Sequence, residues 1–200
     1  MSMDHLHGNM LASVDVETTG TVPGYHEIVQ IAVAPLSDDL RPLAGVTPFY
    51  TNLRPEHPER VDLRSWQIHG LCLDDLIENA PIPERAADML VEWFEALHLP
   101  ISKRLVPLAH NWPFECGFLK AWLGPQGMDH VFHYHSRDAM GFAVALNDKA
   151  VFAGRQPLFE SVSLSNLCRF FNVENAKPHD ALSDALAEAE VYRAMLTTDP

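Results

Sequence analysis

The segment LASVDVETTG, residues 11–20, joins an apolar strand pattern to two acidic residues, Asp15 and Glu17. Its apolar positions predict a buried β-strand, and the TTG that follows predicts a turn. Because side chains alternate along a strand, both acids lie on one face. Two like charges side by side repel each other and destabilise a sheet. A positive charge beside the pair would offset this repulsion.

The composition places the chain among ordinary globular proteins. Its 200 residues are 47% hydrophobic, which suits one domain with a sizeable core. We expect a flexible N-terminal segment at 1–10 and a single domain at 11–200. No apolar run reaches the ~18 residues of a membrane span, and the N-terminus lacks the basic-then-apolar pattern of a signal peptide. No membrane association is expected.

Cysteine usage and charge restrict the class of protein further. The chain has an odd number of cysteines, Cys72, Cys116 and Cys168, and they are far apart in the sequence. We therefore expect free thiols in a reducing, cytoplasmic compartment. A net charge of −13 is unusual for a nucleic-acid binder. However, an acidic site that holds divalent cations gains positive charge that the composition does not count.

The order of the predicted elements indicates an α/β fold. Strand patterns occupy 11–17, 27–36 and 47–55, and we expect them to pair as consecutive antiparallel partners. Helical spacing follows at 63–81, with breaks at Gly70 and Pro81, and an amphipathic helix at 82–99. Next come a strand at 104–111 and a helix at 111–123, with Asn111 as its N-cap. The last elements are a strand or loop leading into a helix at 130–146, and helices at 163–171 and 180–196. This order predicts a mixed central sheet flanked by helices.

Two later segments supply further acids. AHNWPFECGFL places Glu115 in the first turn of a helix, and KPHDALSDALAEAEVY places His179 just before the last helix and Asp184 within its first turns. Together with Asp15 and Glu17, these acids stand in apolar surroundings, where carboxylates seldom lie without a partner. Hard oxygen ligands suit magnesium or manganese. Two such ions would support in-line attack of water on a phosphate.

The motifs resemble those of DnaQ-like 3′→5′ exonucleases of the DEDD type, in the subclass that uses a histidine. VDVETTG is similar to the family's first motif, HNWPFE to its second and HDALSDA to its third. IHGLCLDDLIENAP resembles the family's IHGI segment, and Asp138 resembles an aspartate that follows the second-motif helix. The likeness runs from about 11 to 196 in the family's order. It implies an RNase H-like fold, with three antiparallel strands followed by parallel strands.

The resemblance also implies roles for individual residues. Asp15, Glu17 and Asp184, with Glu115 beside them, would hold two magnesium or manganese ions. His179 would take the proton from the attacking water or orient that water. The residues expected around the terminal nucleotide are Val16, Thr18, Ile68, His69 and Phe114. Glu115 departs from the family, whose second motif ends in Asp, and its extra methylene is either accommodated or displaces a metal and slows the reaction.

The implied function is metal-dependent release of nucleoside monophosphates from a single-stranded or frayed 3′ end, with DNA favoured over RNA. One alternative is an exonuclease-fold interaction subunit with weakened catalysis, bound to a polymerase, which Glu115 supports. The other is an RNA-trimming 3′→5′ exoribonuclease, because the TTG of the first motif occurs both in DNA proofreading relatives and in RNA-trimming ones.

Simpler interpretations exist for single residues. Asp15 and Glu17 would also suit a solvent-facing edge strand. Asp184 taken alone resembles an exposed helix acid, as Glu188 and Glu190 do, and His179 taken alone resembles a capping residue. The matching motifs favour the metal site over these interpretations. The histidines at 130, 133 and 135 lack a cysteine or carboxylate that would complete a zinc site.

Overall fold

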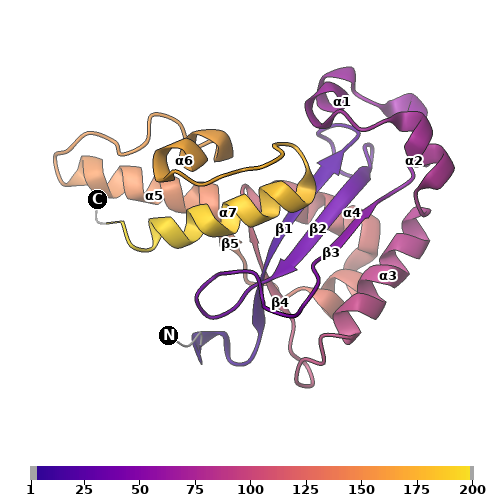
Figure 1. Cartoon of the computed structure of the whole chain (residues 1–200), viewed down its shortest axis with the longest axis horizontal. Coiled ribbons are helices and arrows are strands. Elements are labelled where there is room, and N and C mark those ends of the chain that lie inside the picture. Colours follow the sequence, from indigo (N-terminus) through magenta and orange to yellow (C-terminus); the bar gives the residue numbers. More distant parts are fainter. Residues whose placement is uncertain (1–3, 199–200) are drawn as a thin grey trace.

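The computed structural model describes residues 4–198, and its elements form a mixed sheet covered by helices (Figure 1). The five strands stand in the order β3-β2-β1-β4-β5. β1 pairs antiparallel with β2, and β2 with β3, whereas β1–β4 and β4–β5 are parallel. The strands are β1 (Met10–Thr18), β2 (Ile28–Pro35), β3 (Phe49–Asn52), β4 (Leu105–Ala109) and β5 (Arg137–Asp138). The predicted RNase H-like arrangement of antiparallel and then parallel strands is confirmed.

Helices cover both faces of this sheet. They are α1 (Leu63–His69), α2 (Leu73–Asn79), α3 (Pro83–Glu95), α4 (Trp112–Val131), α5 (Ala139–Phe152), α6 (Leu164–Phe171) and α7 (Ala181–Met195), with short 3-10 helices at Asp4–Leu6 and Pro58–Arg60. α7 crosses β1 and β2 on one face and packs on α5 and α6, while α3 and α4 pack on the other side (Figure 1). α1 lies near the C-terminal end of β1 (Figure 1).

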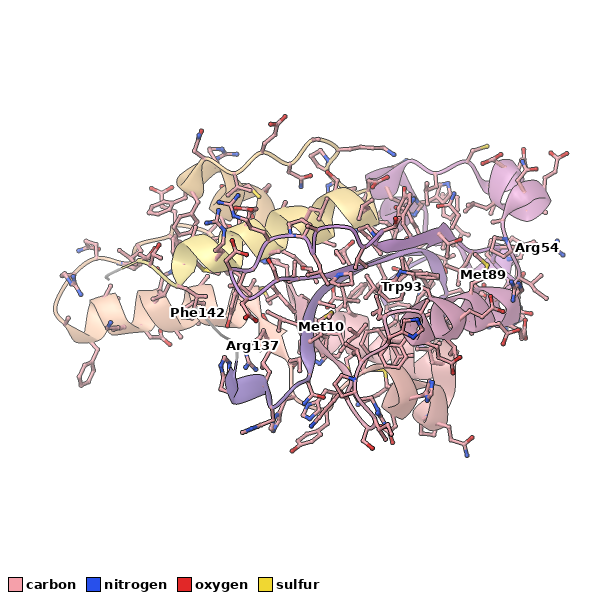
Figure 2. The ribbon with its side chains drawn as sticks, turned by 60° about the horizontal axis from the view of Figure 1, so that its bottom comes forward. Met10, Arg54, Met89, Trp93, Arg137 and Phe142 are labelled. Atoms are coloured by element: carbon pink, nitrogen blue, oxygen red, sulfur yellow. The ribbon has the colours of Figure 1, made fainter. Side chains whose placement is uncertain are left out.

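The two faces of the sheet have separate cores. Between the sheet and α3 and α4, Val14, Ile31 and Phe118 belong to one large cluster of buried apolar residues. Met10 and Trp93, which Figure 2 labels, are partly buried and pack against it. On the other face, a smaller cluster that includes Leu108 and Ala189 joins the sheet to α7. Helices α5, α6 and α7 pack on one another in a further cluster, against which the labelled Phe142 packs (Figure 2). Burial on both faces explains why β2 is apolar along nearly its whole length.

The helix after β4 differs from the prediction at its N-cap. Asn111 occupies the N-cap position, but its side chain makes no capping hydrogen bond, because its backbone is left-handed with φ of 84°. The predicted end at 123 is confirmed, because Gly124 leaves the helical conformation with φ of 65°. A second helical segment starts at Pro125, a position where its missing N–H is tolerated, and runs to Val131. The label α4 covers both segments, and the glycine–proline pair marks the break between them.

The N-terminal segment predicted to be flexible, 1–10, lies partly outside the described residues, which begin at 4. In the described part, Leu6 is buried against the sheet and Met10 begins β1. The flexibility of the segment stays a prediction.

None of the helices in the described part of the chain combines the length and the apolar character that a membrane crossing requires.

Candidate active site

Alternation along β1 places its two acids on the face that α7 covers. Ala12, Val14 and Val16 point into the core beneath α3 and α4. The intervening residues point the other way, toward α7, and include Asp15 and Glu17. The period-two prediction for the two acids therefore agrees with the packing of their neighbours.

The last motif brings its acid and its histidine to Glu17. Ligand atoms of Glu17, His179 and Asp184 all lie within 4.8 Å of one another. The Asp184 carboxylate accepts hydrogen bonds from the backbone N–H of His179, at 3.1 Å, and from the side-chain amide of Asn175. His179 itself is exposed and has a left-handed backbone with φ of 63°. A strained backbone held by such bonds places the imidazole at the rim of the acidic cluster.

Burial and the close packing of the acids raise their pKa values. Burial raises the pKa of Asp15 well above its usual range, and the charges of Glu188 and Glu17 raise it further. Burial also raises the pKa of Glu17 to about 8, with added repulsion from Asp184 and Asp180. Without a counter-charge these carboxyl groups hold protons that they would lose in water. The cluster is therefore suited to bind cations.

Glu115 lies near Asp15, but it is not among the three residues whose ligand atoms converge within 4.8 Å. It lies in the first turn of α4 and is only 4% exposed. Its charge contributes to the raised pKa of Asp15, and burial raises its own pKa well above the usual range. Its Oε2 atom has no hydrogen-bond partner among the described residues. An orphaned, buried carboxylate oxygen beside other acids fits a divalent cation with hard oxygen ligands.

A buried polar network fixes the start of α7, and the sequence analysis did not identify it. Gln30 of β2 accepts a hydrogen bond from the backbone N–H of Ala181 at 2.8 Å and donates to Tyr50 at 3.0 Å. The Tyr50 hydroxyl donates to Asp180, the N-cap of α7, at 2.8 Å. A glutamine within the apolar segment EIVQIAVAPL was the available signal. The network holds the helix that carries Asp184 against the sheet.

Asp138 fixes the start of α4 in a similar way. One of its carboxylate oxygens accepts from the backbone N–H of Trp112 at 2.9 Å, and the other caps α5 by accepting from Gly141 at 2.8 Å. The side chain of Asp138 thus holds the first N–H group of α4, at a helix start where Asn111 makes no side-chain capping bond. It holds the turn in which Glu115 lies.

The residues expected around a nucleotide have different surroundings. Ile68 on α1 is 55% exposed. His69 beside it is half-buried, and its pKa is lowered by burial and by the nearby His179. Phe114 is half-buried and its ring packs on Phe118. Of these three, His69 is the one that the structure places near a residue of the acidic cluster, His179.

The two expected contacts on β1 lie deeper. The side chain of Val16 is in the core on the opposite face of the sheet. Thr18 is buried, and its hydroxyl donates to the carbonyl oxygen of Gly20. We therefore expect Val16 and Thr18 to meet a substrate through the backbone and not through the side chains.

One prediction about the acids was wrong. Glu188 was grouped with exposed helix acids, but it is fully buried and accepts hydrogen bonds from Ser13, Val14 and His110. Its spacing of four residues from Asp184, on a face otherwise rich in alanine, was the signal that could have identified it.

Comparison with solved structures supports the fold. A zinc-bound complex of Escherichia coli exonuclease I with single-stranded DNA matches with a TM-score of 0.74 and 18% identity, covering 96% of this chain and 41% of that chain. Cell-death related nuclease 4 matches with a TM-score of 0.71 and 14% identity, covering 94% of this chain and 64% of that chain. The present chain thus spans about two fifths of the length of exonuclease I.

Comparison of sequences defines the family. The 3′-5′ DNA exonuclease Cap18 of Escherichia coli is 23% identical over 185 residues, which are 92% of this chain and 90% of the relative. A model of the RNase_T exonuclease family matches residues 13–192. This range contains all three acidic motifs, and the match confirms the resemblance to DnaQ-like exonucleases. The chain therefore belongs to the RNase_T exonuclease family.

Proposed function

We propose that this chain is a metal-dependent exonuclease that removes nucleotides one at a time from the 3′ end of DNA. The observation that carries the proposal is the convergence of Glu17, His179 and Asp184 within 4.8 Å, next to Asp15 and the buried Glu115. The family membership supports hydrolysis at a strand end. The similarity to the 3′-5′ DNA exonuclease of Escherichia coli supports the 3′→5′ direction.

The four acids would hold two magnesium or manganese ions. Asp15, Glu17 and Asp184 are the proposed ligands, and Glu115 would act beside them, because all four offer the hard oxygen atoms that these ions prefer. Bound ions would lower the pKa of the attacking water and stabilise the leaving 3′ oxygen. His179 is exposed at the rim of the cluster. It would accept the proton of that water or hold the water in line with the phosphate.

DNA is the proposed substrate. Exonuclease I is bound to single-stranded DNA in the matching structure, and the curated relative is a DNA exonuclease. The exposed Ile68 and the half-buried His69 and Phe114 would surround the terminal nucleotide. Stacking of a base on the Phe114 ring would tolerate any base, which suits removal of nucleotides without regard to sequence.

A second candidate is an exonuclease-fold subunit with weakened catalysis that binds a polymerase. Glu115 favours it, because a glutamate in place of the family's aspartate alters the distance between carboxylate and metal. A cytoplasmic location is proposed for either candidate. It is supported by the three cysteines, which are all free thiols.

A comparison of substrates tests the proposal. We would digest single-stranded DNA, duplex DNA and RNA of one sequence, each labelled at the 5′ end, with magnesium or manganese. The proposal predicts a ladder of labelled products on DNA, with single strands degraded fastest. Faster digestion of RNA would replace the substrate assignment by the RNA-trimming alternative. No digestion of any substrate would favour the weakened subunit.

A further inference from the structure

Glu188 is a buried acid that the proposed mechanism does not use. It lies on α7 one turn after Asp184 and is fully buried. Its Oε1 accepts hydrogen bonds from the hydroxyl of Ser13, at 2.6 Å, and from the backbone N–H of Val14, at 3.2 Å. Its Oε2 accepts from the backbone N–H of His110 at 2.7 Å. Both oxygens are therefore engaged with protein donors.

The donors mark the place where two parallel strands separate. The ladder between β1 and β4 ends at the pair Ser13↔Leu108. Val14 follows this pair on β1, and His110 lies two residues beyond it on the other side, just past the end of β4. The carboxylate of Glu188 bridges the two backbones there and accepts from N–H groups that lie beyond the ladder. The acids converge directly after this bridge.

The bridge joins the three elements that carry the acids. α7 carries Glu188 and Asp184, and β1 continues from Val14 to Asp15. His110 leads, five residues on, to Glu115 in the first turn of α4. The Glu188 side chain thus links α7 and β1 to the segment that leads into α4. Burial of its carboxyl group near other acids is unfavourable on its own. An apolar residue here would leave two buried N–H groups unpaired.

We propose that Glu188 is a positioning residue, which sets the distances among Asp15, Glu115 and Asp184 without touching metal or substrate. This inference rests on the proposed function. When a group that orients metal ligands without binding the metal is mutated, metal affinity or activity typically falls about 10- to 100-fold. The same range is expected here.

The variant Glu188→Gln tests the inference. The glutamine oxygen still accepts from Ser13 and Val14, but its amide N–H₂ faces the N–H of His110, so the link to β4 is lost. We expect Mn²⁺ to bind about 10-fold or more weakly to the DNA-free protein in calorimetry. We expect kcat to fall about 10- to 100-fold while KM for DNA changes less than about threefold.

Two controls separate positioning from a general loss of stability. Glu190→Gln makes the same change on the same helix, at a residue that pairs with Arg193 and not with the strands. Val191→Ala removes a buried methyl pair from the second apolar cluster and lowers stability without touching the bridge. Both should keep the Mn²⁺ affinity of the wild type. Ser13→Ala removes one bond of the bridge and should weaken Mn²⁺ binding in the direction of Glu188→Gln.

The outcomes are distinct. Wild-type Mn²⁺ affinity in both Glu188→Gln and Ser13→Ala would overturn the inference. If Glu188→Gln does not fold, Ser13→Ala alone decides in the same way. A wild-type protein that binds Mn²⁺ but degrades no nucleic acid would contradict the proposed function, while the calorimetric comparison would still decide the role of Glu188.

Discussion

Side-chain identity matters most at the rim of the acidic cluster, where His179 lies. His179 is placed within 4.8 Å of Glu17 and Asp184, so its ring nitrogen has two conceivable roles: proton acceptor or metal ligand. A positioned general base contributes about 10²- to 10⁴-fold in rate. A metal ligand contributes to affinity for the metal as well.

We predict that His179→Ala lowers kcat by about 10²- to 10⁴-fold and leaves Mn²⁺ affinity almost unchanged. The measurement is single-turnover digestion together with calorimetry of Mn²⁺ binding. His135→Ala serves as the control, because that ring packs on His133 and Tyr134 instead. A parallel loss of affinity and rate would make His179 a ligand and not a base.

Glu115 provides the second test at this scale. Glu115→Gln removes a charge beside the proposed cations and should lower activity strongly at low magnesium. Glu115→Asp restores the family's residue, so we expect activity to be retained or increased. A shift of ~1 Å in a reacting group changes rates about 100-fold, so the sign of the Asp effect measures how the pocket fits the longer side chain. Wild-type activity of Glu115→Gln would remove this residue from the mechanism.

The sequence predicted the three residues whose ligand atoms converge, Glu17, His179 and Asp184, and the reason is local. DxE on a strand and HxxxxD across a helix start have fixed spacings, so the period of the element already sets which side chains face together. Glu188 and Gln30 escaped prediction because their partners lie far away in sequence. The partners of Asn175 are only eight and nine residues away, and it was missed because they are side chains on the following helix. For Glu188, the alanine-rich face that it shares with Asp184 was a signal, but that pattern does not name its partners.

At the scale of single elements, the start of α7 depends on side chains from the sheet. Gln30 accepts from the N–H of Ala181, and Tyr50 donates to Asp180. The first bond serves an N–H group that has no partner within the helix, and the second holds the N-cap side chain, which itself accepts from the N–H of Ser183. The position of the first turn, and with it that of Asp184, therefore depends on β2 and β3.

We predict that Gln30→Leu destabilises the protein by about 1–3 kcal/mol, because a buried N–H loses its acceptor. Amide exchange at 181–184 should accelerate and kcat should fall. The control is Ile31→Val on the same strand, which removes a methylene from the opposite core and costs about 1 kcal/mol. Equal effects of both variants on kcat would show that general destabilisation, and not the anchoring of α7, is responsible.

The elements themselves were largely predictable. The breaks at Gly70 and Pro81 separate α1, α2 and α3 as expected, and the pattern of β2 fits its burial on both faces. The first segment of α4 ends before Gly124 as expected, but the second segment from Pro125 to Val131 was not predicted. β5 has only two residues, and its place in the sheet depends on pairing with β4 and not on its own pattern.

For the molecule as a whole, the acidic cluster links stability to pH. Burial raises the pKa of Asp15 and Glu115 above their usual range and that of Glu17 to about 8. The metal-free folded protein therefore keeps protons that the unfolded chain loses near pH 4. This stabilisation is complete below the unfolded pKa values and is lost as the pH rises toward 8.

We predict that the melting temperature in EDTA falls between pH 5 and pH 9, and that Glu17→Gln makes the fall smaller. Magnesium or manganese should raise the melting temperature, and by more at higher pH, because the ions bind the deprotonated cluster of the folded state. Thermal melts across this range with and without metal provide the measurement. Identical curves in both conditions would contradict a metal site built on these acids.

The most direct test of the central claim is a time course of digestion of a single-stranded DNA labelled at its 5′ end. We predict that the wild type with magnesium shortens the labelled strand one nucleotide at a time from the 3′ end. EDTA or Asp15→Asn should stop the reaction, because EDTA removes the metal ions and Asp15→Asn removes one of their proposed carboxylate ligands. Shortening that continues in EDTA or with Asp15→Asn, or short labelled products at the earliest time, would contradict the account.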